Sequence, residues 1–353
     1  MRTPRLLAAV TTFAALAVGL AGCGDTSSTS TDRRTVRLLT HDSFAVSDDV
    51  LAAFTTDTGI EVELVQGGDA GSVVNQAILS NGSPQADVLF GIDSTFLTRA
   101  LEADLFEPYE AAALDQVDPA LLLDEEHRVT PIDYGDVCLN YDKAWFADRD
   151  LTVPTSLDDL VEPAYADLLV VENPATSSPG LAFLLATIDE LGDGWTEWWA
   201  ELRANGVEVT DGWEEAYYGS FSGGGGSEGS RPLVVSYASS PPAEVVFADP
   251  PIDEPPTGVI EATCVRQVEG AGILAGTARR AEAEALIDFL LSERFQADVP
   301  LSMFVFPARR GVTLPEVFLE HAARPEGVRT ISPAEVGGRR DEWIRTWTDV
   351  VLR

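Results

Sequence analysis

The chain has 353 residues, which is long enough for two lobes of ordinary domain size. Its hydrophobic content of 45% is normal for a globular protein. Its 58 acidic residues against 23 lysines and arginines give a formal net charge of −35. This charge argues against nucleic acid or an anionic membrane surface as a partner, because both would be repelled, and it suits a cationic ligand.

The first 23 residues are typical of a lipoprotein signal and not of a folded segment. Two arginines precede an apolar stretch at 6–20, and the sequence LAGC then ends at Cys23, which would become the lipidated N-terminus. A membrane-spanning helix needs about 20 apolar residues, more than this stretch contains. We therefore expect lipidation at Cys23, a flexible tether over 24–35, and an extracytoplasmic protein anchored to the cell membrane.

Strands alternate with helices in the rest of the chain. Alternating or continuous apolar runs predict strands at 35–40, 61–65, 86–91, 168–171, 207–210, 232–237 and 271–274. Apolar residues at helical spacing predict helices at 46–58, 72–80, 95–103, 180–191, 195–205, 281–290 and 332–353. This order predicts an α/β protein whose mainly parallel sheets are covered by helices. We expect Trp343 and Trp347, four residues apart in the last helix, to pack against the rest of the protein.

Cys138 and Cys264 remain as an even pair once Cys23 carries lipid. Each lies in a strand-like stretch, and compartments outside the cytoplasm favour disulfides. We predict a disulfide between them, with two separate buried thiols as the alternative.

Groups that would support catalysis or metal binding are scarce. The three histidines, His41, His127 and His321, have no zinc-binding spacing. The nearest stretch to a Gly-x-Ser-x-Gly elbow carries Phe221 at the serine position. We therefore expect no enzyme, no metal site and no cofactor.

Candidate ligand-binding residues follow three of the predicted strands, at the edge where open α/β sheets bind ligands. Ser177 and Ser178 open an apolar helix, whose free amides can bind an anion, although ordinary capping is the alternative. Trp213 and Tyr237 lie at the ends of two predicted strands, and two such rings can grip a flat cation. Taken singly, each aromatic residue would more often be part of the core.

Several of these segments, in this order, resemble the periplasmic thiamine-binding protein family, the substrate-binding components of thiamine ABC transporters. The resemblance runs from about residue 36 to the C-terminus. Its more specific elements are TSSPG at 176–180, GWEEAY at 212–217 and SYASSP at 236–241. Further matching segments are HDSF at 41–44, ADVLFGID at 86–93, DYG at 133–135 and NYDK at 140–143.

The resemblance implies a type II periplasmic-binding-protein fold, in which two lobes joined by hinge strands close around a ligand like a Venus flytrap. We assign 36–136 and 266–302 to one lobe, and 137–265 and 303–353 to the other. The resemblance further implies delivery of thiamine, or of thiamine phosphates, to an ABC transporter permease and its ATPase. We expect the protein to be a monomer.

The resemblance also implies which residues contact the ligand. The positions are Asp69, Ala70, Ser177, Ser178, Trp213, Tyr237, Ala238, Ser239, Ser240 and Pro241, together with His41, Asp42 and Phe304. Trp213 and Tyr237 would pack on the rings, and Asp69 would accept hydrogen bonds from the aminopyrimidine or offset the positive charge. The two serines would receive the hydroxyethyl group or the phosphates.

Three positions depart from the family pattern. His41 and Phe304 replace other aromatic residues, whereas Ala243 stands where the family has an aromatic residue and removes a ring. A related vitamin or a thiamine precursor is therefore an alternative ligand. A ferric-ion carrier using Tyr217 and Tyr218, a polyamine binder and, in a different class, a hydrolase of phosphorylated cofactors are further alternatives.

Overall fold

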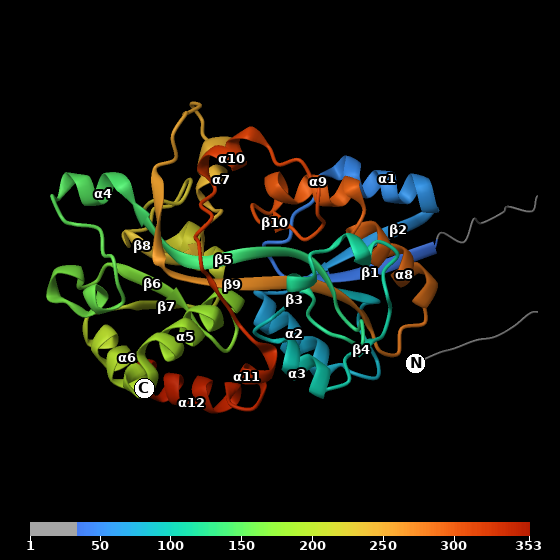
Figure 1. Ribbon diagram of the computed structural model, residues 1–353, viewed down its shortest axis with the longest axis horizontal. Coiled ribbons are helices and arrows are strands. Elements are labelled where there is room, and N and C mark those ends of the chain that lie inside the picture. The colour runs from blue at the N-terminus through green and yellow to red at the C-terminus, as the bar shows by residue number, and fades with distance from the viewer. Residues whose placement is uncertain (1–33) are drawn as a thin grey trace, which may run out of the picture. The chain divides into compact units, whose positions relative to one another are not determined.

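A computed structural model describes residues 34–353 (Figure 1), so the predicted signal, the lipidation site at Cys23 and most of the predicted tether lie outside the described residues. Strand β1 (Arg34–Thr40) begins inside the stretch predicted as a tether. The reason is that Arg34 already pairs with Ile60, the first residue of β2 (Ile60–Gln66). The predicted tether therefore overlaps β1 at residues 34 and 35.

The strands of the described part form one connected, mixed sheet. Its main path has the order β2-β1-β3-β9-β5-β8-β6-β7. The further strands on this path are β3 (Val88–Asp93), β5 (Thr130–Asp142), β6 (Leu169–Glu172), β7 (Glu208–Thr210), β8 (Leu233–Tyr237) and β9 (Thr257–Leu274). Three short strands, β4 (Phe106–Glu107), β10 (Phe306–Pro307) and β11 (Arg329–Thr330), pair with β9 or β5 off this path.

Two parallel half-sheets flank the two long central strands. β1 pairs in parallel with β2 and β3, and β6 pairs in parallel with β7 and β8. Antiparallel pairing joins β9 to β3 and to β5, and β5 to β8. We call the part around β1, β2 and β3 the first lobe and the part around β6, β7 and β8 the second lobe. The chain thus has the two-lobed α/β fold expected from its sequence, with β5 and β9 shared by both lobes.

Cys138 of β5 and Cys264 of β9 form a disulfide with their Cα atoms 4.2 Å apart, which confirms the predicted pairing. The crosslink lies where the register of β5 against β9 shifts, between Val137 and Leu139. It therefore joins the two shared strands at their irregular point, where β5 also pairs with β8 of the second lobe.

Helices cover both faces of the sheet (Figure 1). They are α1 (Asp48–Thr58), α2 (Ala70–Leu79), α3 (Leu97–Glu102), α4 (Lys143–Asp148), α5 (Ser178–Leu191), α6 (Trp195–Ala204), α7 (Pro241–Val246), α8 (Arg280–Leu290), α9 (Glu293–Ser302) and α10 (Glu316–His321). One apolar cluster packs α1, α8 and α9 on the first lobe, and a second extends under both lobes through α2, α3, α5 and α6. Within residues 34–353, no helix is both long and apolar enough to cross a membrane.

Short 3-10 helices complete the connections. They are η1 (Leu114–Gln116), η2 (Pro119–Leu121), η3 (Asp158–Val161), η4 (Pro163–Tyr165) and η5 (Gly192–Gly194).

The C-terminal segment predicted as one helix is two helices, α11 (Pro333–Gly337) and α12 (Arg340–Val351). The break falls at two consecutive glycines, which have low helix propensity. α11 contacts α3 of the first lobe, whereas α12 packs on α6 of the second lobe. Trp343 and Trp347 are buried, and the Trp347 ring meets that of Trp199 in α6 at 5.5 Å between centroids, which confirms the predicted packing role.

Candidate ligand-binding site

A cavity of about 310 Å3 lies between the two lobes. Small-molecule sites typically have volumes of about 300–1,000 Å3. The walls come from the segments after β1, β7 and β8, from β5 and β9, and from the residues after α9. Six of the predicted contact residues line this cleft: His41, Asp42, Trp213, Tyr237, Ser240 and Phe304.

Trp213 is fixed from three directions. Its Nε1 donates a hydrogen bond to Ser236 Oγ at 2.9 Å, and its backbone amide donates to Asp69 Oδ2 at 2.9 Å. Its indole stacks on Tyr217 with ring centroids 5.0 Å apart. Tyr217 lies in a π-helical turn, η6 (Glu215–Ser220), a feature frequent at functional sites. Because Tyr217 covers one face of the indole, the other face is the one left to a ligand.

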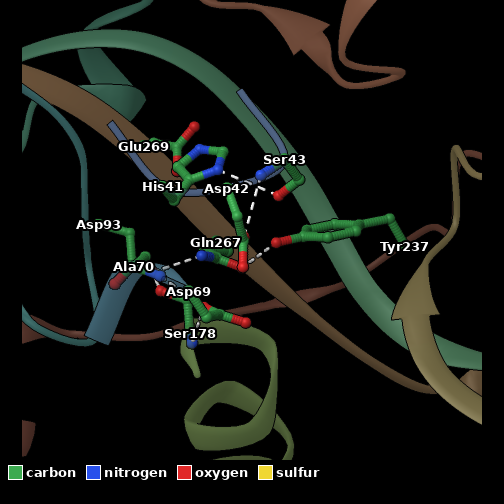
Figure 2. Close-up of polar contacts among 10 residues, drawn as sticks. All are labelled: His41, Asp42, Ser43, Asp69, Ala70, Asp93, Ser178, Tyr237, Gln267 and Glu269. Atoms are coloured by element: carbon green, nitrogen blue, oxygen red, sulfur yellow. Dashed lines mark hydrogen bonds and ion pairs between the residues drawn. The ribbon is translucent and has the colours of Figure 1, made fainter. Parts of the chain in front are cut away.

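Tyr237 lies across the cleft floor, and its hydroxyl donates to Gln267 Oε1 at 3.1 Å (Figure 2). Its ring packs directly over Gly135 of β5, where a Cβ atom would sit 2.7 Å from the Cδ1 atom of Tyr237. A glycine inside a strand often marks such a close approach. Gly135, in the DYG segment, therefore provides the room that the Tyr237 ring occupies.

His41 contacts both an alcohol and a carboxylate (Figure 2). Its Nδ1 lies 3.0 Å from Ser43 Oγ, and its Nε2 lies 3.4 Å from Glu269 Oε1. Burial by itself lowers the pKa of His41, but the negative charges of Glu269, Asp69 and Asp42 outweigh that effect. The pKa is consequently raised above its ordinary value, and His41 gains a proton easily in mild acid.

Four carboxyl groups line the cleft: Asp42, Asp133, Glu214 and Glu269. Burial, with the added charge of Glu269, raises the pKa of Asp133 well above its usual range. Burial likewise raises the pKa of Glu214. Within the described part of the chain, no arginine or lysine lines this cleft. Among the described residues, the lining therefore combines several acidic groups with no permanently charged base, which suits a cationic ligand better than an anionic one.

Two phenylalanines lie near Ala243 at one wall of the cleft. Ala243 and Phe247 both line the cleft, and Phe247 directly follows α7. Phe247 meets Phe304 edge to face at 5.5 Å between centroids. Phe304 has a φ of +55°, rare for a bulky residue and common at ligand sites. Position 243 itself carries no ring, so the aromatic side chains of this wall are those of Phe247 and Phe304.

Seven predicted contact residues do not line the cleft: Asp69, Ala70, Ser177, Ser178, Ala238, Ser239 and Pro241. Asp69 shows why. Its Oδ1 accepts hydrogen bonds from the amides of Ala70 at 2.6 Å and Ser178 at 3.1 Å (Figure 2). Its Oδ2 accepts a hydrogen bond from the amide of Trp213. Backbone donors thus occupy this carboxylate, which is only 7% exposed.

Carboxylates of the first lobe also cover the start of α5, where the sequence predicted phosphate binding. Ser177 caps the helix by accepting from the Gly180 amide at 3.4 Å, and Ser178 Oγ donates to Asp93. Gln267 donates to Asp93 as well, and burial raises the pKa of Asp93 to about 7. In this arrangement carboxyl groups of the protein itself occupy the start of α5, and Ser178 joins the two lobes through Asp69 and Asp93.

Asp133 and Glu269 were not among the predicted contacts, although both line the cleft. Each is an acidic residue within an otherwise apolar part of a long strand. Charged residues are rarely buried without a role. A carboxylate inside a predicted strand is therefore the sequence signal that could have marked Asp133 and Glu269 as candidate cleft residues.

Metal ligation has little support in this cleft. Within the described residues, no group of three or more His, Cys, Asp or Glu side chains could hold a metal ion. Tyr217 is buried, and its hydroxyl donates to Glu244 Oε1 at 2.9 Å. Burial and the nearby Glu244 raise the pKa of Tyr217 well above its ordinary value, which disfavours the phenolate that ferric iron would bind.

Two lobes that share long strands and enclose a lined cleft define the class of extracytoplasmic solute-binding proteins used in transport. The family model described as bacterial extracellular solute-binding protein matches residues 83–325. The thiamine-binding periplasmic protein of Escherichia coli (strain K12) is 32% identical over 318 residues, which are 89% of this chain and 92% of that protein. The thiamine-binding periplasmic protein of Brucella suis biovar 1 is 29% identical over 358 residues, an alignment that covers 99% of this chain and 100% of that protein.

A solved structure described as a periplasmic thiamin binding protein matches with a TM-score of 0.79 at 30% identity, covering 90% of this chain and 96% of that one. The chain belongs to the bacterial extracellular solute-binding proteins, in the group of the periplasmic thiamine-binding proteins. Iron-bound HitA from Pseudomonas aeruginosa, with a TM-score of 0.70 at 20% identity, shares the fold alone.

Proposed function

We propose that this protein captures thiamine in the cleft between its lobes and delivers it to an ABC importer. The observation that carries the proposal is the lining of the cleft, which combines aromatic rings with carboxylates and, within the described residues, includes no lysine or arginine. Thiamine joins two flat rings, one of them a permanent cation. The names of the relatives agree with this chemistry.

The aromatic walls suit a flat cation. Trp213 and Tyr237 would pack on the two rings, while Phe247 and Phe304 close the opposite wall. A cation over an aromatic face gains about 1–2 kcal/mol when both are desolvated. Because Trp213 and Tyr237 are already held by hydrogen bonds to Ser236 and Gln267, little freedom is lost on binding.

The carboxylates supply the polar contacts. Glu269 and Asp133 lie on neighbouring strands at the cleft floor, where they offset the thiazolium charge or accept hydrogen bonds from the aminopyrimidine amine. In this proposal Asp69 contributes by fixing Trp213 and by joining the lobes. The same acidic lining disfavours a phosphate group, so thiamine should bind more tightly than thiamine diphosphate.

Capture requires the lobes to move, and delivery requires the protein to stay near the membrane. We propose that residues 36–136 with 266–302, and 137–265 with 303–353, move about β5 and β9 as two bodies. The C-terminal segment contacts both sides, through α11 and α12. A lipid on Cys23 would anchor the monomer to the cell membrane beside its permease and ATPase.

Calorimetric titration of the mature protein tests the proposal. Thiamine, thiamine diphosphate, spermidine and ferric citrate are compared, and the thiamine diphosphate sample is assayed for released phosphate. Tight binding of thiamine with quenching of tryptophan fluorescence is the expected result. Binding of spermidine or ferric citrate without thiamine binding would assign the cleft to another cation, and released phosphate would indicate an enzyme.

A further inference from the structure

A second cavity of about 310 Å3 lies among α2, α3 and α12. It is lined by Asn75, Arg99, Ala175, Arg340, Asp341, Ile344 and Arg345. None of these residues lines the ligand cleft. Three arginines around one cavity stand out in a chain with 58 acidic and 23 basic residues. The cavity is therefore a local positive site on a negative protein.

Arg340 is a buried cation with too few partners. It is 5% exposed, and its guanidinium lies over the Phe96 ring, 4.4 Å from the centroid. Its Nη1 donates to Asp341 Oδ1 at 3.0 Å, but its Nε has no hydrogen-bond partner in the described part of the chain. Burial and the like charge of Arg99 lower the pKa of Arg340, and the carboxyls of Asp341 and Asp93 offset this effect only in part. A desolvated charge in this position is costly unless an anion lies near it.

The other charges around the cavity do not balance it. Arg99 Nη1 donates to the same oxygen, Asp341 Oδ1, at 3.4 Å, and its buried Nε also has no partner among residues 34–353. One carboxylate thus serves two guanidinium groups, and the exposed Arg345 adds a third. Arg340 and Asp341 are also the first residues of α12, whose N-terminus has no side-chain cap. The positive end of a helix dipole adds to the attraction for an anion.

We propose that this cavity binds a small oxyanion of the phosphate class. Guanidinium groups present paired donors that match the oxygens of phosphate. The proposal is independent of the ligand in the main cleft, because the two cavities share no lining residue. It gives a role to three arginines whose positive charges only one carboxylate of the described residues, that of Asp341, contacts in this cavity.

The ligand-free mature protein is titrated with inorganic phosphate, and with chloride at the same ionic strength, by calorimetry and thermal melting. Phosphate should raise the melting temperature and chloride should not. Arg345→Gln, at an exposed position, should weaken phosphate binding by about tenfold, the effect of one charge-assisted hydrogen bond. Arg294→Gln, an exposed arginine of α9 outside the cavity, is the matched control and should bind phosphate normally.

Asp341→Asn gives a test of opposite sign. It removes the carboxylate that competes with phosphate, so phosphate affinity should rise severalfold, an effect that general damage to the fold would not produce. Equal responses to phosphate and chloride would overturn the proposal. It would also fail if phosphate affinity in Arg345→Gln matched that of the unchanged protein, or if Asp341→Asn weakened phosphate binding.

Discussion

The carboxylate of Asp69, at the start of α2 in the first lobe, accepts a hydrogen bond at 2.9 Å from the backbone amide of Trp213 in the second lobe. The same side chain accepts from the Ser178 amide at 3.1 Å. One buried residue therefore joins the start of α2, the start of α5 and the segment after β7. The distance between the lobes and the position of Trp213 therefore depend on the same carboxylate.

Replacing Asp69 by Ala should weaken thiamine binding even though the side chain does not line the cleft. The change leaves buried amides without an acceptor, at a cost of about 1–3 kcal/mol, and favours an open arrangement of the lobes. Calorimetry measures the affinity, and X-ray scattering of the ligand-free protein measures the opening. Asp57→Ala, at an exposed site in α1, removes the same charge and should change neither. Unaltered affinity and scattering in the Asp69 variant would refute the linking role.

Replacing Trp213 by Ala should weaken thiamine binding by about 1–3 kcal/mol, because stacking and the attraction of the cation are lost. The quenching of tryptophan fluorescence by thiamine should disappear in the same variant. Trp145→Ala, in α4 and outside the cleft, should retain both the affinity and the quenching. If the Trp213 variant bound thiamine as the unchanged protein does, Trp213 would have no place in the binding site.

Thiamine affinity should fall when the pH is lowered from 7.5 to 5.5. Because the pKa values of Asp133 and Glu214 are raised, these carboxyls take up protons at a higher pH than ordinary carboxyls do, and because the pKa of His41 is raised, its positive charge also appears at a higher pH than usual. Both changes weaken the attraction for a cation. Titrations at the two pH values measure the effect, which His41→Gln should reduce. Tighter binding at pH 5.5 would contradict this account.

The stability of the ligand-free protein should follow pH in a defined direction. Burial raises the pKa of Asp93 from 3.8 to about 7, so the folded protein holds a proton that the unfolded chain releases. The resulting stabilisation is present below about pH 4 and is lost as the pH rises through 7. Urea midpoints should therefore be lower at pH 8 than at pH 5, and Asp93→Asn should flatten that dependence. A midpoint that increased with pH in both proteins would exclude Asp93 as the cause.

Removing the disulfide should destabilise the fold. Cys138 and Cys264 are 126 residues apart in sequence, and closing so long a loop restricts the unfolded chain. We expect Cys138→Ala with Cys264→Ala to lower the free energy of unfolding by about 2–4 kcal/mol in denaturant titrations. A reductant should affect the unchanged protein and not the double variant. Identical unfolding curves for the two proteins would show that the crosslink adds nothing to stability.

Local sequence patterns were sufficient for the strands and helices of the lobes and for strand-like stretches around Cys138 and Cys264, but not for the full length of β5 and β9. Short apolar runs such as that of β3 predict buried parallel strands, because periodicity is a local property. β5 and β9 contain acidic residues and glycines, and their length is set by pairing with partners far away in the chain. The disulfide was predictable from the number of cysteines and the expected compartment, without any knowledge of this pairing.

The candidate site likewise contains residues that the sequence could predict and contacts that it could not. That Trp213 and Tyr237 line the cleft was predictable, because one follows a strand and the other ends a strand at the edge where such folds bind ligands. The hydrogen bonds of Asp69 to Ser178 and Trp213 were not, since they depend on how closely two lobes approach. Predicted contacts that this closure buries, such as Ser178, bind the opposite lobe in the structure.

The edge-to-face contact between Phe247 and Phe304 has a consequence for the size of the cleft. The two rings belong to segments that follow different helices, α7 and α9. A smaller side chain at either position would widen the cavity at this wall without altering the hydrogen bonds that hold Trp213 and Tyr237. The dimensions of the pocket can therefore change on one side while the opposite contacts stay as they are.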